Sequence, residues 1–265
     1  MPGLSSSTYS PQPTCRVLDV PVSTLDVEQV CSFVASAARR DGGYVTVCNV
    51  HSLVTAHNDP EHLRALVESI TNVADGMPLV WAARLLGRPA VRHVRGQTLF
   101  ERLLAGDDLG VKRHFLLGGS PQTQSLLLET VRSRFPSATI VGRWVPAFTA
   151  GVPGLPDDIR QDIVNARPDI IWVALGCPRQ EKWMLRHWRS LTPAVLIGVG
   201  AAFDFLAGTK PTAPVWMQRL GAEWLFRLLT EPRRLAWRYL RTNPSFMWRI
   251  AAQVVRERFA HSDRT

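Results

Sequence analysis

Short apolar runs alternate with longer amphipathic stretches over the first 209 residues of the chain. Runs with the length and boundaries of buried strands cover 44–50, 112–117, 138–141, 170–175 and 194–200, with an edge strand expected at 17–22 and a short strand ending at Val73-Ala74. Helices are expected from Thr24 or Asp26 to about Arg40, over 51–57, 60–70, 78–86, 96–104, 121–135 and 157–166, and from Gln180. The stretch 142–156 is rich in glycine and proline and is expected to be a loop. Because strands that alternate with helices form parallel βαβ units, the pattern predicts an α/β fold with a Rossmann-like parallel sheet flanked by helices.

A different pattern begins after Gly208. The stretch 210–214 carries two prolines and is typical of a linker. Three helices are expected over 215–229, 232–241 and 244–259, because a proline ends a helix at the preceding residue. We therefore divide the chain into a disordered leader (1–14), an α/β domain (15–209) and a C-terminal basic helical appendage (210–265).

Composition narrows the class of protein. With 46% hydrophobic residues in a chain of 265, a sizeable core can be buried. No apolar run reaches the roughly 18 residues that a membrane-spanning helix needs. Residues 1–14 have neither the basic nor the apolar region of a signal peptide, so a disordered leader is expected. The four cysteines form no C-x-x-C pair and predict neither a zinc site nor disulfides, which fits a reducing, cytoplasmic setting.

Positive charge is concentrated in the appendage. It holds eleven Lys or Arg and four Asp or Glu, and so carries +7 of the chain's net charge of +9. Arginines interleaved with large aromatic residues at helical spacing suit a helix that lies on an anionic membrane surface. A basic tail can also bind nucleic acid, and a helical subdomain with a solvated basic face explains the spacing equally well. The residues alone leave these interpretations open.

Two loops at predicted strand ends, 176–181 and 198–204, combine small residues with polar side chains. Ligands of open parallel sheets bind outside the carboxyl ends of the strands, so both loops are candidate binding sites. Gln180 can donate to and accept from a uracil or ribose edge, and Glu181 can hold a ribose hydroxyl. Alternatively, Glu181 only stabilises the positive end of its helix. Asp204 either holds its loop together or contacts a ligand.

Three earlier polar residues are further candidates. Asp75 follows an apolar strand and could act as a general base, although an ordinary Asp-Gly turn explains it as well. Asn49 follows the first strand of the sheet, where its amide could orient a sugar or could only cap the next helix. Thr46 lies on that strand.

Anion-binding candidates complete the set. The sequence Gly118-Gly119-Ser120 follows a strand and opens a helix, and backbone N–H groups at such a point suit a phosphate. A tight turn with Ser120 as helix cap explains it too, and no P-loop or dinucleotide pattern is present. Arginine's planar fork also suits phosphate oxygens. The candidates in the appendage are Arg227, Arg233, Arg234 and Arg238.

Five motifs in series resemble the WecG/TagA/CpsF glycosyltransferases (glycosyltransferase family twenty-six). Two of them are Gly176-Cys177-Pro178-Arg179-Gln180-Glu181, similar to the family's G-x-P-x-Q-E, and the stretch 198–208, similar to G-V-G-x-x-F-D-x-x-A-G. The others are Ala74-Asp75-Gly76, Phe115-Leu116-Leu117-Gly118-Gly119, and Glu223-Trp224-Leu225-Phe226-Arg227 followed by Glu231-Pro232-Arg233-Arg234. The chain departs from the family's pattern at two places. The family's R-A-P reads Thr212-Ala213-Pro214 here, and the family's T-x-N reads Thr46-Val47-Cys48-Asn49, which puts the threonine one position early. A shift of one residue along a strand turns a side chain to the other face, so Asn49 is the safer assignment of the two.

The resemblance implies an inverting, metal-independent glycosyltransferase in the synthesis of bacterial surface polysaccharide. It would move a sugar, with N-acetylmannosamine as the first candidate, from a UDP-sugar to a polyprenyl-diphosphate-linked saccharide. Asp75 would be the catalytic general base, and the appendage arginines would neutralise the departing diphosphate. The substrate-binding residues implied are Thr46, Asn49, Gly118, Gly119, Ser120, Gln180, Glu181 and Asp204.

The resemblance also sets expectations about partners. It implies no cofactor, and the sequence has no D-x-D pair that would hold a metal on a nucleotide sugar. The enzyme would lie on the cytoplasmic face of the plasma membrane as a peripheral protein, with its oligomeric state open and no nucleic-acid partner. UDP-glucose or UDP-glucuronate as donor is an alternative within the family. A non-catalytic nucleic-acid-binding protein is a more distant alternative, because it leaves the five motifs unexplained.

Overall fold

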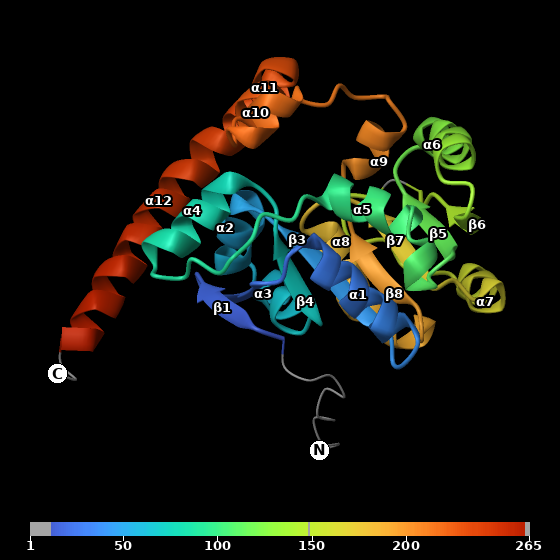
Figure 1. Ribbon diagram of the computed structural model, residues 1–265, viewed down its shortest axis with the longest axis horizontal. Helices are drawn as coiled ribbons and strands as arrows, with labels where there is room; N and C mark the ends of the chain where they lie inside the picture. The colour runs from blue at the N-terminus through green and yellow to red at the C-terminus, as the bar shows by residue number, and fades with distance from the viewer. Residues whose placement is uncertain (1–11, 148, 263–265) are drawn as a thin grey trace.

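A six-stranded parallel sheet forms the centre of the protein, described by a computed structural model over residues 12–147 and 149–262 (Figure 1). The order of the strands is β4-β3-β8-β7-β5-β6. Their bounds are β3 Gly43–Cys48, β4 Thr71–Ala74, β5 Arg113–Gly118, β6 Thr139–Trp144, β7 Ile170–Ala174 and β8 Val195–Gly198. All neighbouring strands in this sheet run parallel, so the predicted α/β fold is confirmed.

Nine α-helices connect and cover these strands within the described part of residues 12–209. They are α1 Val27–Ala38, α2 Val50–Asn58, α3 Pro60–Val67, α4 Met77–Leu85, α5 Gly96–Leu104, α6 Pro121–Arg134, α7 Asp157–Ala166, α8 Arg179–His187 and α9 Ala202–Leu206, and two 3-10 turns lie at Asp107–Leu109 and Trp188–Leu191. Several begin at a side chain that accepts a hydrogen bond from the first turn, which satisfies backbone donors that a helix start leaves free. These caps are Asp26, Asn49, Asp59 and Ser120.

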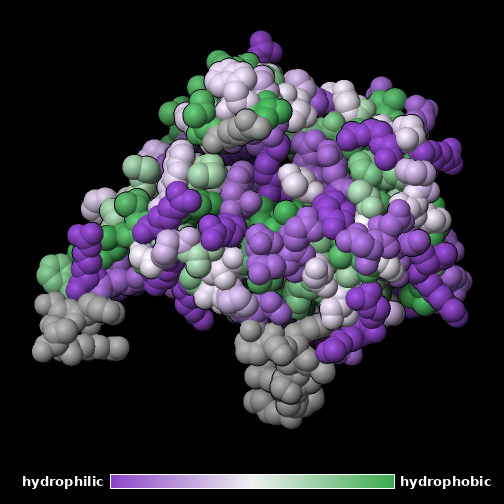
Figure 2. All heavy atoms as spheres, in the orientation of Figure 1, coloured by the Kyte–Doolittle hydropathy of each residue, from purple (hydrophilic) through white to green (hydrophobic). Residues whose placement is uncertain are grey.

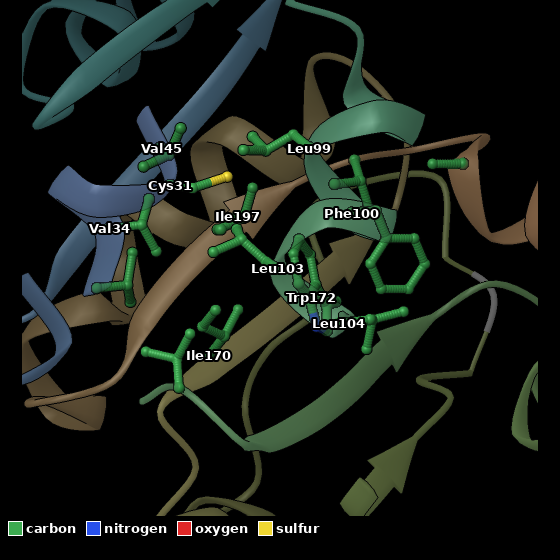
Figure 3. Packing of buried hydrophobic residues seen from close by; sticks show 14 of the residues in the cluster. Cys31, Val34, Val45, Leu99, Phe100, Leu103, Leu104, Ile170, Trp172 and Ile197 are labelled. Carbon is green, nitrogen blue, oxygen red and sulfur yellow. The ribbon is translucent and has the colours of Figure 1, made fainter. Parts of the chain in front are cut away.

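The sheet is buried on both faces, as continuous apolar strands require. Successive residues of β7 point to opposite sides of the sheet. Trp172 joins the core under α1, α5 and α9, whereas Ile171 joins the core under α3, α7 and α8. The Trp172 ring lies 4.4 Å from the ring of Phe100 on α5, measured between centroids (Figure 3). This double cover leaves the strand ends as the place where polar side chains can gather.

Two predicted elements near the edges of the sheet differ in the structure. The edge strand expected at 17–22 is instead a separate antiparallel hairpin, β1 Thr14–Val17 and β2 Val20–Ser23. Its two-residue turn places Leu18 and Asp19 at φ of 47° and 69°, which matches the twist of a tight hairpin. Strand β6 continues through residues 142–144, expected to be loop, because they pair with β5.

The appendage contains α10 Val215–Arg219, α11 Glu223–Thr230 and α12 Pro232–Ser262. The helix expected at 215–229 breaks near Gly221, whose φ is 71°. The break expected before Pro244 is wrong, because α12 runs through this proline. Packing explains the difference: α12 lies along α2, and Phe246 and Ile250 are buried in the core cluster that contains α2 and α4. None of the described helices has the length and apolar character needed to cross a membrane.

Candidate functional site

A cavity opens at the carboxyl ends of β3, β4, β7 and β8 and is completed by the appendage. This is where open parallel sheets bind their ligands. Its polar and charged lining residues are Asn49, His51, Asp75, Arg95, Gln97, Cys177, Gln180, Glu181, Glu223, Arg227, Arg234 and Arg238. Segments far apart in sequence therefore contribute to one polar site.

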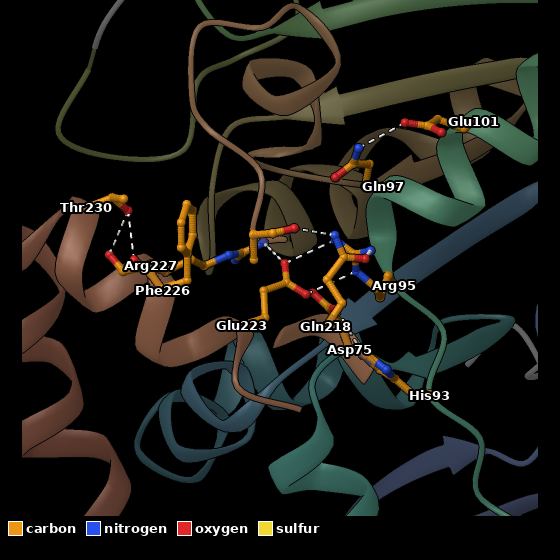
Figure 4. Close-up of polar contacts among 11 residues, drawn as sticks. Asp75, His93, Arg95, Gln97, Glu101, Gln218, Glu223, Phe226, Arg227 and Thr230 are labelled. Atoms are coloured by element: carbon orange, nitrogen blue, oxygen red, sulfur yellow. Dashed lines mark hydrogen bonds and ion pairs between the residues drawn. The ribbon is translucent and has the colours of Figure 1, made fainter. Parts of the chain in front are cut away.

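Asp75 sits directly after β4 on the wall of this cavity. Its backbone N–H donates to the carbonyl of Cys48 at 2.7 Å, which ties the strand end to β3. The side chain is 24% exposed, and one carboxylate oxygen lies 3.8 Å from Nε2 of His93 (Figure 4). A carboxylate that is held in place and open to a cavity can accept a proton from a bound hydroxyl.

Asn49 and Thr46 occupy different surroundings. Asn49 lines the cavity and also caps α2, its side-chain oxygen accepting from the N–H of Ser52 at 3.1 Å. Thr46 is fully buried, and its hydroxyl bonds the side-chain oxygen of Asn72. Side chains alternate along a strand, so Val47 faces the cavity in its place. The structure does not bring Thr46 to the site.

Thr46→Val is expected to lower the free energy of unfolding by about 1–3 kcal/mol, because a buried hydrogen bond is lost and Asn72 loses a donor. Urea unfolding measures this change. The matched control is Thr139→Val on β6, whose exposed side chain should change stability by no more than about 0.5 kcal/mol. UDP, the nucleotide that the resemblance implies, should bind both variants as it binds wild type. A large loss of UDP affinity without a loss of stability would return Thr46 to the binding site.

Gln180 and Glu181 begin α8 at the floor of the cavity. Gln180 donates from Nε2 to Oε1 of Glu181 at 2.9 Å. The remaining oxygen of each side chain is buried with no hydrogen-bond partner among the described residues. Gly198 makes room for the amide, since a Cβ there would lie 3.0 Å from the Gln180 nitrogen. The free oxygen of Gln180 at the cavity floor suits a ligand that presents a hydroxyl or N–H donor, and the free oxygen of Glu181 does so when its carboxyl is ionised.

Burial raises the pKa of the Glu181 carboxyl from its ordinary 4.5 to about 7. The folded protein therefore keeps a proton between these pH values that the unfolded chain releases, so raising the pH across this window lowers the free energy of unfolding. The loss reaches on the order of 3 kcal/mol and is complete above pH 7. Glu181→Gln cannot titrate, and urea unfolding at pH 5 and pH 8 should show a stability difference from wild type that changes with pH. A constant difference would mean that Glu181 is ionised throughout.

Three of the four predicted arginines line the cavity, while Arg233 is exposed and lies outside its lining. Arg227 lies over the Phe205 ring, 4.7 Å from its centroid. The Nε atoms of Arg227 and Arg238 are buried and have no hydrogen-bond partner in the described part of the chain. Arg234 pairs with Glu231 at 2.6 Å and is half exposed. Unpaired guanidinium donors on a cavity wall are suited to an anion such as a diphosphate.

Besides Thr46 and Arg233, four further predicted site residues lie outside the cavity lining. Ser120 caps α6 by accepting from the N–H of Thr123 at 3.0 Å. Asp204 belongs to α9, accepts from Thr123 Oγ1 at 3.3 Å and pairs with Lys210 at 3.1 Å. Gly118 is the last residue of β5, and Gly119 forms the turn between that strand and the cap of α6. The chain after β8 forms the short helix α9, which lies beside this turn. The contact is close, because a Cβ added at Gly119 would lie 3.3 Å from the Phe203 ring.

Several cavity residues were not predicted from the sequence. Arg95 and Gln97 come from the start of α5, and Glu223 begins α11. His51 lies in the first turn of α2, and burial lowers its pKa to about 4, so it is neutral at pH 7. Glu223 belongs to one of the five motifs, but only the arginine of that motif, Arg227, is predicted to have a role. Nothing in the spacing around Arg95 marked it as a partner of the appendage.

Comparisons with known proteins agree with this geometry. The sequence profile of the "Glycosyl transferase WecG/TagA/CpsF family" matches residues 15–260. A Bacillus spizizenii protein named N-acetylglucosaminyldiphosphoundecaprenol N-acetyl-beta-D-mannosaminyltransferase is 29% identical over 235 residues, which are 86% of this chain and 88% of that protein. Proteins of the same name from Bacillus subtilis and Staphylococcus aureus are 30% and 26% identical, covering 77% and 85% of this chain and the same shares of their own lengths.

Proposed function

Because the chain belongs to the WecG/TagA/CpsF family of glycosyltransferases, we propose that it transfers N-acetylmannosamine from a UDP-sugar to a polyprenyl-diphosphate-linked saccharide. The names of its relatives support this acceptor class and this sugar. The observation that carries the proposal is the cavity itself, which brings the Asp75 carboxylate and the guanidinium groups of Arg227 and Arg238 to one site. These are the two kinds of group that sugar transfer from a nucleotide requires.

The chemistry assigns one task to each side of the cavity. The Asp75 carboxylate takes the proton of the acceptor hydroxyl as its oxygen attacks the anomeric carbon. The bond from that carbon to the diphosphate breaks, and its electron pair leaves with UDP. Arg227 and Arg238 stabilise the negative charge that develops on the diphosphate. Attack from the side away from UDP inverts the anomeric configuration, and arginines supply the charge that a metal would supply in other transferases.

UDP release from a panel of UDP-sugars, with and without a lipid-diphosphate-linked N-acetylglucosamine, tests the proposal. We expect acceptor-dependent release from UDP-N-acetylmannosamine that EDTA does not reduce. Release only from UDP-glucose or UDP-glucuronate would change the proposed donor sugar and leave the proposed type of reaction unchanged. Loss of release in EDTA would overturn metal independence, and no release from any donor would contradict the transferase.

The outer surface of the appendage supports a place on the inner face of the plasma membrane. Large apolar side chains are exposed along all three helices, in the region that Figure 2 shows as hydrophobic patches among hydrophilic atoms. They are Val215, Trp216, Leu220, Trp224, Leu225, Leu229, Trp237, Leu240, Met247, Trp248, Val255 and Phe259. Combined with the +7 charge of the appendage, this surface suits an anionic bilayer that holds the lipid-linked acceptor.

Replacing Trp237 and Trp248 together by serine is expected to weaken binding to anionic vesicles by about 10-fold or more, because two large exposed side chains no longer enter the interface. Sedimentation with phosphatidylglycerol vesicles measures this, and neutral vesicles should bind less. The double variant should keep wild-type UDP affinity, since neither residue lines the cavity. Unchanged vesicle binding would contradict insertion of these two side chains into the membrane surface. Salt-dependent retention on single-stranded DNA would favour the nucleic-acid alternative.

A further inference from the structure

Glu223 lies between two guanidinium groups on the cavity wall (Figure 4). Its carboxylate accepts hydrogen bonds from Nη2 of Arg95 at 3.2 Å and from Nη2 of Arg227 at 3.1 Å, and it forms an ion pair with Nε of Arg95 at 3.1 Å. Arg95 also donates to the side chain of Gln218 on α10. The Arg95 and Glu223 side chains are only 17% and 19% exposed, so water screens this pair weakly.

Arg95 is anchored to the strand end that carries Asp75. His93 forms a bridge with Ala74, the last residue of β4, and the N–H of Val94 donates to the Ala74 carbonyl at 2.9 Å. The segment that ends in Arg95 is therefore fixed alongside β4. The Arg95 side chain is therefore linked, through its own backbone, to the strand end that positions Asp75.

Arg227 is held from two sides. The Phe205 ring of α9 lies under its guanidinium, and Glu223, one turn earlier on α11, fixes one edge of it. Its buried Nε has no partner among the described residues. Without the carboxylate between them, the guanidinium groups of Arg95 and Arg227 would face each other as like charges on a poorly solvated wall. Arg227 would then move away from its present position.

We infer that Glu223 is a positioning residue: by binding Arg95 and Arg227 together, it sets the place of the leaving-group arginine relative to the base Asp75. The inference rests on the proposed function and deepens it. Sugar transfer requires the attacking hydroxyl, the anomeric carbon and the departing diphosphate to lie in one line. A displacement of about 1 Å in such an arrangement can cost 100-fold in rate. Donor binding, which several other cavity residues share, depends less on this distance.

The test compares kcat, KM and UDP affinity in Glu223→Gln, Arg95→Gln and the double variant. Each single change is expected to lower kcat by about 10- to 100-fold and to change UDP affinity by less than about 3-fold. Because both changes break one connection, the double variant should be no slower than the slower single variant. The matched control is Glu257→Gln. That residue forms a bidentate pair with Arg88, at 2.8 and 3.1 Å, which also joins the appendage to the α/β domain but lies outside the cavity.

Glu257→Gln should lose as much thermal stability as Glu223→Gln and keep wild-type kcat. An equal loss of kcat in both variants would mean that Glu223 is only a structural contact. Independent, additive losses in Glu223→Gln and Arg95→Gln would overturn the inference that the two residues act through one connection.

Hydrogen exchange provides a readout that does not need turnover. Glu223→Gln should speed exchange in both 93–97 and 215–230, and no change there would overturn the inference even if the proposed transfer itself proved wrong. Absence of transfer in wild type, with this exchange result intact, would count against the proposed function alone.

Discussion

Asp75→Asn is expected to lower kcat by about 10²- to 10⁴-fold while UDP binds with wild-type affinity. The amide has the size and shape of the carboxylate but cannot take the proton of the acceptor hydroxyl. The side chain is 24% exposed and its position is set by backbone bonds to β3, so the substitution should leave the site's geometry in place. Acceptor-dependent UDP release measures the rate, and calorimetric titration with UDP measures binding.

The matched control is Asp169→Asn. Asp169 lies before β7, at the opposite end of the sheet, where its carboxylate accepts from the N–H groups of Lys112 and Arg113 at 2.8 Å. This change should lower stability and leave kcat unaffected. Wild-type turnover in Asp75→Asn would remove that residue from the mechanism and direct attention to Glu181, the other cavity carboxylate at the strand ends.

The residues at the floor of the cavity could be predicted because local sequence patterns place them there. Asn49 and Gln180 each follow an apolar strand and start a helix, and the parallel sheet brings such points to one edge. Asp75 follows the same rule at the end of β4. Thr46 could not be resolved in this way, because a single residue of register decides which face of β3 a side chain takes.

Long-range packing determined the features of the fold and of the site that the sequence did not predict. Asp204 was assigned to a loop, but the chain after β8 winds into α9 and directs its carboxylate to Thr123 and Lys210. Pro244 did not end its helix, because burial of residues on α12 against α2 outweighs the cost of about 3 kcal/mol that a proline brings. Arg95 binds Glu223, which lies 128 residues away in the sequence, and no local sequence pattern predicts such a contact.

Arg227→Lys is expected to lower kcat/KM by about 10²- to 10³-fold, the range for removing one directed donor from a developing negative charge. Lysine keeps the positive charge. It loses the planar fork, which lets Arg227 lie over Phe205 and pair with Glu223 while its buried Nε has no partner among the residues that the structure describes. The same assay of acceptor-dependent UDP release, with titrations of donor and acceptor, measures the change.

Arg241→Lys is the matched control, because Arg241 also lies over an aromatic ring, 5.7 Å from the centroid of Trp237, but outside the cavity lining. With an acceptor that carries a short, water-soluble lipid chain, this variant should turn over like wild type. If Arg227→Lys keeps most of the activity, the appendage contributes positive charge rather than a directed donor, and the diphosphate needs only the field of the remaining cavity arginines. If lysine fails as completely as alanine at this position, the geometry that Phe205 and Glu223 impose on the guanidinium is what the departing diphosphate requires.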